Sequence, residues 1–282
     1  MNFATLLPDI EPWLKSLAAA EPVQLIKSSS WALPMILCGH VLALTVLGGA
    51  TLLPGLRLMG VGMTSVSPSS IEKTVRPWLW GALIALAITG LLMVIVNPMK
   101  LYRAPAFLVK VVALVPALIL SFGVVRLIAS RDGVITQQAR ILAGVALALW
   151  LGAALIFGTS YGAAPGTFHV VCAGWLIVMA FGSNLTRILL GAITAVIIIW
   201  MAVSTMVLHN PLDDYDLVME IDRWTLRFTA LVVAGFMVWE FTRRRAPDSP
   251  APLNRLIGIL SILAWFTVAA AGRWIGLGGG GG

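Results

Sequence analysis

Long apolar stretches, separated by short polar or basic segments, recur along the whole chain. They lie at 31–54, 77–96, 106–128, 141–157, 168–182, 189–208, 228–241 and 255–271. A run of about 20 apolar residues is typical of a helix that crosses a membrane. Backbone in lipid must be paired internally, and strict alternation of apolar and polar residues is absent, which excludes a closed barrel. The pattern therefore predicts an all-α bundle of about eight transmembrane helices.

The first and last segments differ from this pattern. Residues 1–27 carry several charges, and their larger apolar side chains fall at helical spacing: Leu6, Leu7, Ile10, Trp13, Leu14 and Leu17. Such a segment is expected to form an amphipathic helix that lies at the membrane interface, here on the extracytoplasmic side. Residues 277–282 are almost entirely glycine and are expected to form a flexible tail.

Composition and charge narrow the class of protein. Apolar residues make up 59% of the chain and charged residues only 11%, which is far from a soluble globular domain. The net charge of +7 is spread over the loops, so it does not indicate nucleic-acid binding. The loops after the first, third, fifth and seventh stretches hold more of the Lys and Arg residues, which predicts a bacterial inner-membrane protein with both termini outside the cytoplasm.

The spacing of marker residues suggests an internal duplication. The stretches at 77–96 and 189–208 both open on Gly-Ala and both lead to Asn-Pro, at Asn97-Pro98 and Asn210-Pro211. Further pairs follow in the same order: His40 with His169, Lys110 with Arg227, Arg140 with Arg255, and Trp150 with Trp265. Bilayer thickness alone explains some of these spacings. The whole order favours two parallel four-helix repeats, at 28–158 and 159–276.

Three ionisable residues lie inside the apolar stretches, and a fourth directly precedes one of them. These are His40 and Lys110 in the first predicted repeat and His169 and Arg227 at the matching places in the second. Ionisable groups inside a membrane are costly, and each is therefore a candidate functional residue. All four are predicted to lie in the outer half of the membrane.

A deep imidazole, a cation nearer the surface and apolar walls together suit haem b. Imidazole is a common axial ligand of haem iron, and the porphyrin requires an apolar slot between helices. Lys110 and Arg227 could bind the propionates. Lys110 is also a possible second axial ligand if burial keeps its amine neutral. The alternatives are an interhelical hydrogen bond for His40 and a lysine that extends to the interface for Lys110.

Copper is the competing metal. Met35 and Cys38 lie near His40, and Cys172 follows His169 by three positions, on the same face of a helix. Thioether, thiolate and imidazole are ligands that suit Cu(I). Methionine and cysteine are also ordinary packing residues in apolar helices, so this pattern has a purely structural explanation as well.

An acidic segment follows the sixth apolar stretch. It contains Asp213, Asp214, Asp216, Glu220 and Asp222. In the predicted topology it is extracytoplasmic, where it could bind a basic partner. Because Asn-Pro and Asp are common in turns, a solvated turn is the alternative interpretation.

The first half of the chain resembles a known group of bacterial membrane proteins. The segments are "GHVLALTVLGGATLLPGLRLMG", "RPWLWGALIALAITGLL" and "NPMKLYRAPAFLVKVVAL", within residues 28–128. They are similar to the broad CopD-like group, which includes the copper-resistance D proteins and the HemJ-type protoporphyrinogen oxidases. The resemblance to the HemJ type implies haem b, with His40 and Lys110 at the positions of an essential histidine and lysine. This chain is longer and apparently duplicated, so the oxidase activity is not carried over.

Three functions are consistent with these features. The first is a haem b protein that transfers electrons at the extracytoplasmic side, with a periplasmic redox protein or quinone as partner, as the membrane subunit of a larger redox assembly. The second is a copper or small-solute transporter, although every acid lies outside the stretches or, like Glu240, at an end, where it is not placed for ion coupling inside the membrane. The third is a non-catalytic scaffold recruited through the acidic segment. The sequence leaves open whether the protein is an enzyme.

Overall fold

The structure, a computed structural model, is mostly helical in the part of the chain that it describes. The described residues are 1–161, 163–208, 220–221, 224–225, 227–229, 231–233, 235–236, 239 and 252–277. No strand occurs among them, which confirms the predicted all-α class.

Within these residues, five helices are long and apolar enough to cross a membrane. They are α4 (Ala32–Met59), α5 (Pro68–Val96), the continuous run of α7 (Pro105–Leu118), η2 (Ile119–Val125) and α8 (Arg126–Ala129), α9 (Gln137–Tyr161), and α13 (Pro252–Leu277). Two further apolar helices, α10 (Ala163–Phe181) and α11 (Asn184–Leu208), match the predicted stretches at 168–182 and 189–208. The stretch at 228–241 is described only in separate pieces, at 228–229, 231–233, 235–236 and 239, so the count of eight stays a prediction.

Two prolines at the edges of predicted stretches lie inside helices. Helix α4 continues through Pro54 to Met59 and ends at Gly60, whose φ of 74° is a left-handed conformation that glycine adopts readily. Helix α5 contains Pro77 and begins earlier, after Ser67, whose side chain accepts a hydrogen bond from a backbone N–H of the first turn. Each apolar stretch of the sequence therefore corresponds only to the most apolar part of a longer helix.

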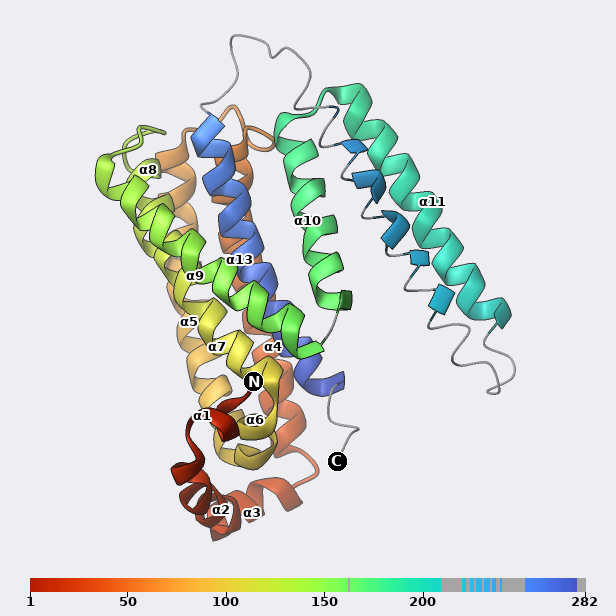
Figure 1. Ribbon diagram of the computed structural model, residues 1–282. Coiled ribbons are helices and arrows are strands. Elements are labelled where there is room, and N and C mark those ends of the chain that lie inside the picture. Colours follow the sequence, from red (N-terminus) through yellow and green to blue (C-terminus); the bar gives the residue numbers. More distant parts are fainter. Residues whose placement is uncertain are drawn as a thin grey trace.

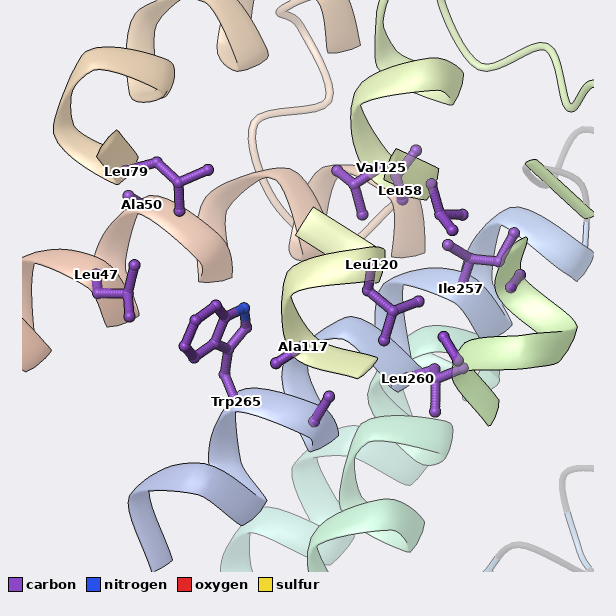
Figure 2. Close-up of a cluster of buried hydrophobic side chains, with 14 of the residues drawn as sticks. Leu47, Ala50, Leu58, Leu79, Ala117, Leu120, Val125, Ile257, Leu260 and Trp265 are labelled. Atoms are coloured by element: carbon purple, nitrogen blue, oxygen red, sulfur yellow. The ribbon is translucent and has the colours of Figure 1, made fainter. Parts of the chain in front are cut away.

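Helix α13 occupies the centre of the bundle. It packs against α4, α7, α9 and α10 (Figure 1), and 61% of its most apolar stretch is buried, the largest share among the five long helices. Figure 2 shows Trp265 of α13 between Leu47 of α4 and Ala117 of α7. The indole N–H of Trp265 donates a hydrogen bond of 2.7 Å to Ser121 in η2, a π-helical segment that follows Pro116. This hydrogen bond satisfies the one polar group of a buried indole.

The position of α13 bears on the predicted repeats. The sequence assigns this helix to the second repeat, at 159–276, yet it packs against α4 and α7 of the first. Helices α10 and α11 lie to one side of the bundle (Figure 1). The fold therefore joins the two halves through a shared central helix, and the duplication itself stays a prediction.

The contact between α4 and α13 depends on two glycines. A Cβ atom added at Gly258 would come within 2.6 Å of the backbone oxygen of Gly55, and one added at Gly55 would come within 2.9 Å of Ile262. Real Cβ atoms are not found at such distances, so the two backbones approach each other as closely as glycine allows. Small residues at a crossing point are typical of packed helices in membranes.

Large apolar side chains cover the outside of the helices. Leu42 on α4, Leu91 on α5, Leu155 on α9 and Ile188 on α11 are each more than half exposed. Extended apolar surface of this kind indicates contact with lipid. Together with the five long helices, this surface gives the fold the character of a membrane protein.

The N-terminal segment forms several short helices at one end of the bundle (Figure 1). They are α1 (Phe3–Leu6), η1 (Pro8–Ile10), α2 (Glu11–Ala19) and α3 (Glu21–Ser28), and the short helix α6 (Pro98–Arg103) lies beside them. The amphipathic segment expected at 1–27 is helical but divided into short helices, because prolines at 8, 12 and 22 lie in the first turns of new helices. Trp13 and Leu25 are exposed, as expected for side chains at a membrane interface.

Polar contacts hold this segment against α6. The Tyr102 hydroxyl donates to the Leu7 carbonyl at 2.8 Å, and the Asn2 side-chain amide donates to the Arg103 carbonyl at 2.9 Å. Glu11 forms ion pairs of 3.0 Å with Lys15 and with Arg103. Hydrogen bonds from these two cations, Lys15 first, hold the pKa of the Glu11 carboxyl below its usual value of 4.5.

We expect acidification to release the N-terminal segment. Because the pKa of Glu11 is lowered in the folded protein, its contribution to stability is present above the usual pKa and is lost as the pH falls through the lowered pKa. The protection of residues 1–28 from hydrogen exchange, relative to the intrinsic rate at the same pH, should therefore fall at acidic pH, and Glu11→Gln should lower it already at neutral pH. Glu21→Gln on exposed α3 is the matched control, and equal effects of the two variants would contradict the assignment.

Candidate functional site

His40 lies about two turns into α4, in the half of the bundle nearest the N-terminal helices. Its imidazole is half-buried and points toward α5, where Nδ1 lies 2.9 Å from the Thr89 hydroxyl. Gly90, the next residue of α5, leaves room for the ring, because a Cβ atom there would lie 3.6 Å from His40 Cε1. The histidine therefore faces the bundle interior, and the neighbouring helix fixes its orientation.

Lys110 meets the other edge of the same imidazole. It lies in the second turn of α7, and its Nζ is 3.4 Å from His40 Nε2. On its other side it borders α13, where a Cβ atom at Gly272 would lie 3.6 Å from Nζ. The histidine and lysine predicted to share one slot are therefore brought together where α4, α5, α7 and α13 meet.

The surroundings of this pair are mostly apolar. Val109 and Ala271, the neighbours of Lys110 and Gly272 in sequence, are fully buried and pack with Phe157 of α9. An amine and an imidazole in such surroundings lose much of their hydration, so an interaction between the two nitrogens is stronger there than the same interaction would be in water. The Thr89–His40–Lys110 cluster can bind a proton between its nitrogens or offer them to a metal.

His169 has a different environment. It is buried in α10, with Nε2 2.9 Å from the Thr267 hydroxyl of α13 and its ring edge-on to Phe157 and Phe266. Thr267 also accepts a hydrogen bond of 3.0 Å from the indole N–H of Trp150. The imidazole thus belongs to a buried network of hydrogen bonds that joins α9, α10 and α13.

Arg227 does not join His169. Its side chain is exposed, and its guanidinium carbon lies 4.9 Å from the centre of the Trp224 ring, one helical turn earlier. The spacing that relates Lys110 to Arg227 along the chain therefore does not give an equivalent pair in space. Of the two predicted pairs, the structure assembles only His40 with Lys110.

The predicted copper ligands are not gathered around a common point. Met35 and Cys38 are exposed on α4, whereas His40 faces the interior. Cys172 is half-buried and packs against the cluster that contains Met59 and Ala180. Among the described residues, no group of three or more His, Cys, Asp and Glu side chains could hold a metal ion.

Most of the predicted partner-binding segment lies outside the described residues. This holds for Asp213, Asp214, Asp216 and Asp222. Glu220 is described and is exposed on a helical turn. Its exposure is compatible with either interpretation of the acidic segment.

Sequence reasoning missed four residues that shape these two clusters. Thr89, Gly90 and Gly272 surround the His40–Lys110 pair, and Thr267 binds His169. Thr89 and Gly90 end the segment "RPWLWGALIALAITG", which contributes to the family resemblance, and this was the only available signal for them. Gly272 and Thr267 stand in an apolar helix rich in small residues, where nothing distinguishes them.

Comparison with known proteins gives a match over part of the chain and no function. No curated protein and no solved structure matches the chain. Residues 35–162 match a family of unknown function, DUF6644. The matched part runs from α4 to α9 and contains His40, Thr89 and Lys110, whereas His169 and α13 lie beyond it.

Proposed function

We propose that this chain is an integral membrane protein that binds haem b between α4 and α7 and takes part in electron transfer near the extracytoplasmic side. The observation that carries the proposal is the approach of Lys110 Nζ to His40 Nε2, at 3.4 Å, in a mostly apolar setting. The resemblance of residues 28–128 to CopD-like and HemJ-type proteins supports the same two residues.

The donor set fits this cofactor. Imidazole is a common axial ligand of haem iron, and a buried amine can act as a second nitrogen ligand when it is neutral. Gly90 and Gly272 lie against His40 and Lys110, and a Cβ atom at either position would be in ordinary van der Waals contact with them, at 3.6 Å. When bound, haem b supplies one-electron redox chemistry.

The chain's own residues would have distinct tasks. His40 and Lys110 would be the residues that hold the cofactor. Lys100 and Arg273 are exposed near the same end of the bundle, where positive charge suits the propionates. The apolar helices around the site would exclude water. One such site per chain follows, because His169 and Arg227 form no second pair.

The charge distribution supports an inner-membrane location. Basic residues cluster at the end of the bundle opposite the N-terminal helices, among them Arg57, Arg126, Arg131 and Arg140. By the positive-inside rule this end would face the cytoplasm and both termini the periplasm. The site then lies in the outer half of the membrane, within reach of a quinone or a periplasmic redox protein, and the chain would serve as the membrane subunit of a redox assembly.

Absorption spectroscopy tests the proposal directly. The protein is expressed with haem supplementation, purified in detergent, and measured oxidised and after dithionite reduction. A Soret band that sharpens and shifts on reduction, with about one haem per chain, is expected. Purified, folded protein without a Soret band would overturn the proposal, and metal analysis of the same sample would show whether copper is present instead.

The two histidines should respond differently to substitution. His169→Gln is expected to keep the Soret band, because His169 binds Thr267 in a structural network. It should lower the apparent Tm, since losing a buried hydrogen bond costs about 1–3 kcal/mol. His40→Gln is the matched substitution and should remove the band. Loss of the band in folded His169→Gln protein would instead place a ligand in α10.

A further inference from the structure

The Thr89 hydroxyl has only one proton. The direction in which this proton points determines which nitrogen of the His40 ring is protonated. Thr89 Oγ1 lies 2.7 Å from the Ala85 carbonyl, one turn earlier in α5, and donates its proton there. Its oxygen can then act only as an acceptor toward His40 Nδ1, 2.9 Å away. With the hydroxyl proton directed at Ala85, the arrangement favours a ring proton on Nδ1.

This assignment leaves the lone pair of the neutral imidazole on Nε2. That nitrogen faces Lys110 Nζ at 3.4 Å, so it accepts from the amine or is open to a metal. Metal-binding histidines usually donate their second ring N–H to an acceptor, which fixes both the tautomer and the ring orientation. The Thr89 hydroxyl meets this requirement, because it donates its proton to the Ala85 carbonyl and its oxygen can accept a hydrogen bond.

The second histidine provides an internal comparison. Thr267 donates to the Leu263 carbonyl at 2.8 Å and accepts from Trp150, so it too can only accept from its histidine. Here, however, it meets Nε2 of His169 rather than Nδ1. A threonine hydroxyl that acts as an acceptor therefore favours protonation of opposite nitrogens in the two rings. Of these two histidines, His40 is the one whose Nε2 is not bound to the threonine.

We propose that Thr89 is a positioning residue that holds His40 as the Nδ1–H tautomer and so presents the Nε2 lone pair to Lys110 and to the proposed cofactor. The role given to Thr89 rests on the proposed function. The test of the tautomer does not, because it uses haem-free protein. Removing the hydroxyl removes the acceptor, so Thr89→Val should free the ring to change tautomer. Thr89→Ser keeps the acceptor and should restore the wild-type state.

The closing experiment uses nitrogen-15 NMR of histidine-labelled, haem-free protein at about pH 9, where an ordinary histidine with pKa about 6.5 is neutral. The chain has three histidines, and His40→Gln and His169→Gln assign the signals. His40 is expected to be protonated at Nδ1 in wild type and in Thr89→Ser, and to gain Nε2–H character in Thr89→Val. Thr45→Val, which removes an exposed hydroxyl from α4, is the matched control and should change nothing.

The outcomes separate this inference from the proposed function. A wild-type His40 protonated at Nε2, or a Thr89→Val spectrum identical to wild type, overturns the role of Thr89 even if haem binds. A wild-type protein without a Soret band whose His40 carries Nδ1–H supports Thr89 and overturns the haem proposal. If Thr89→Val does not fold, the tautomer of the wild type alone decides the question.

Discussion

His40→Ala is expected to abolish the Soret band of the purified protein while leaving the protein folded. The imidazole is the one ordinary iron ligand at the proposed site, and the small alanine side chain replaces it without strain in α4. Because the ring is half-buried and bonded to Thr89 and Lys110, some stability is lost as well. Absorbance at the Soret maximum relative to that at 280 nm measures the effect.

A neighbouring residue supplies the control. Cys38→Ala changes an exposed side chain two positions earlier on the same helix and should retain the full Soret absorbance. Imidazole added to His40→Ala should restore part of the band by filling the vacated space. A folded His40→Ala protein that keeps a wild-type spectrum would show that His40 is not a ligand, and the proposed site would then be abandoned.

Substitution of Lys110 is expected to change the spectrum in a different way from His40→Ala. Lys110→Met keeps the length and apolar character of the side chain while replacing the amine, so the apolar packing near Gly272 is preserved. If Lys110 is the second ligand, the reduced spectrum and the midpoint potential should shift while haem stays bound through His40. A lower haem content with an unchanged spectrum would indicate that Lys110 binds a propionate instead.

The His40–Lys110 pair could be predicted because both residues are ionisable groups within apolar stretches, at similar depth from the same end. Depth along a helix follows from sequence position alone. The direction that a side chain faces depends on which helices are neighbours, and uniformly apolar helices carry little information about that. Thr89 and Gly272 were missed for this reason, since each matters only because of what lies opposite it.

The predicted pairing of His169 with Arg227 shows the limit of repeat spacing. Similar intervals along the chain place residues at similar depths, but they do not place them side by side. Helix α13 packs against α4 and α7, and its Thr267 binds His169, so the second histidine is drawn into a structural network. The central position of α13 follows from close backbone contact, which a hydropathy pattern does not reveal.

Gly258→Ala tests that contact and is expected to destabilise the bundle strongly. The added Cβ would lie 2.6 Å from the Gly55 backbone oxygen and 2.9 Å from Met59 Cγ. Met59 can adjust, but a backbone oxygen cannot move unless α4 and α13 separate. Overpacking of this kind costs about 1–3 kcal/mol, and Gly258→Val should cost more. Thermal unfolding in detergent, followed by helical circular dichroism, should show a lower apparent Tm for both variants.

Gly144→Ala on α9 is the matched control, because a Cβ atom there meets nothing within 4 Å. Alanine is favoured over glycine within a helix by about 0.5–1 kcal/mol, so this variant should be unchanged or slightly more stable. If alanine destabilises the protein at position 258 but not at position 144, the loss of stability results from the α4–α13 crossing and not from the alanine itself. If Gly258→Ala is as stable as wild type, α13 does not pack this closely against α4. The position of Gly272 beside Lys110 would then lose its support as well, because the same helix carries both glycines.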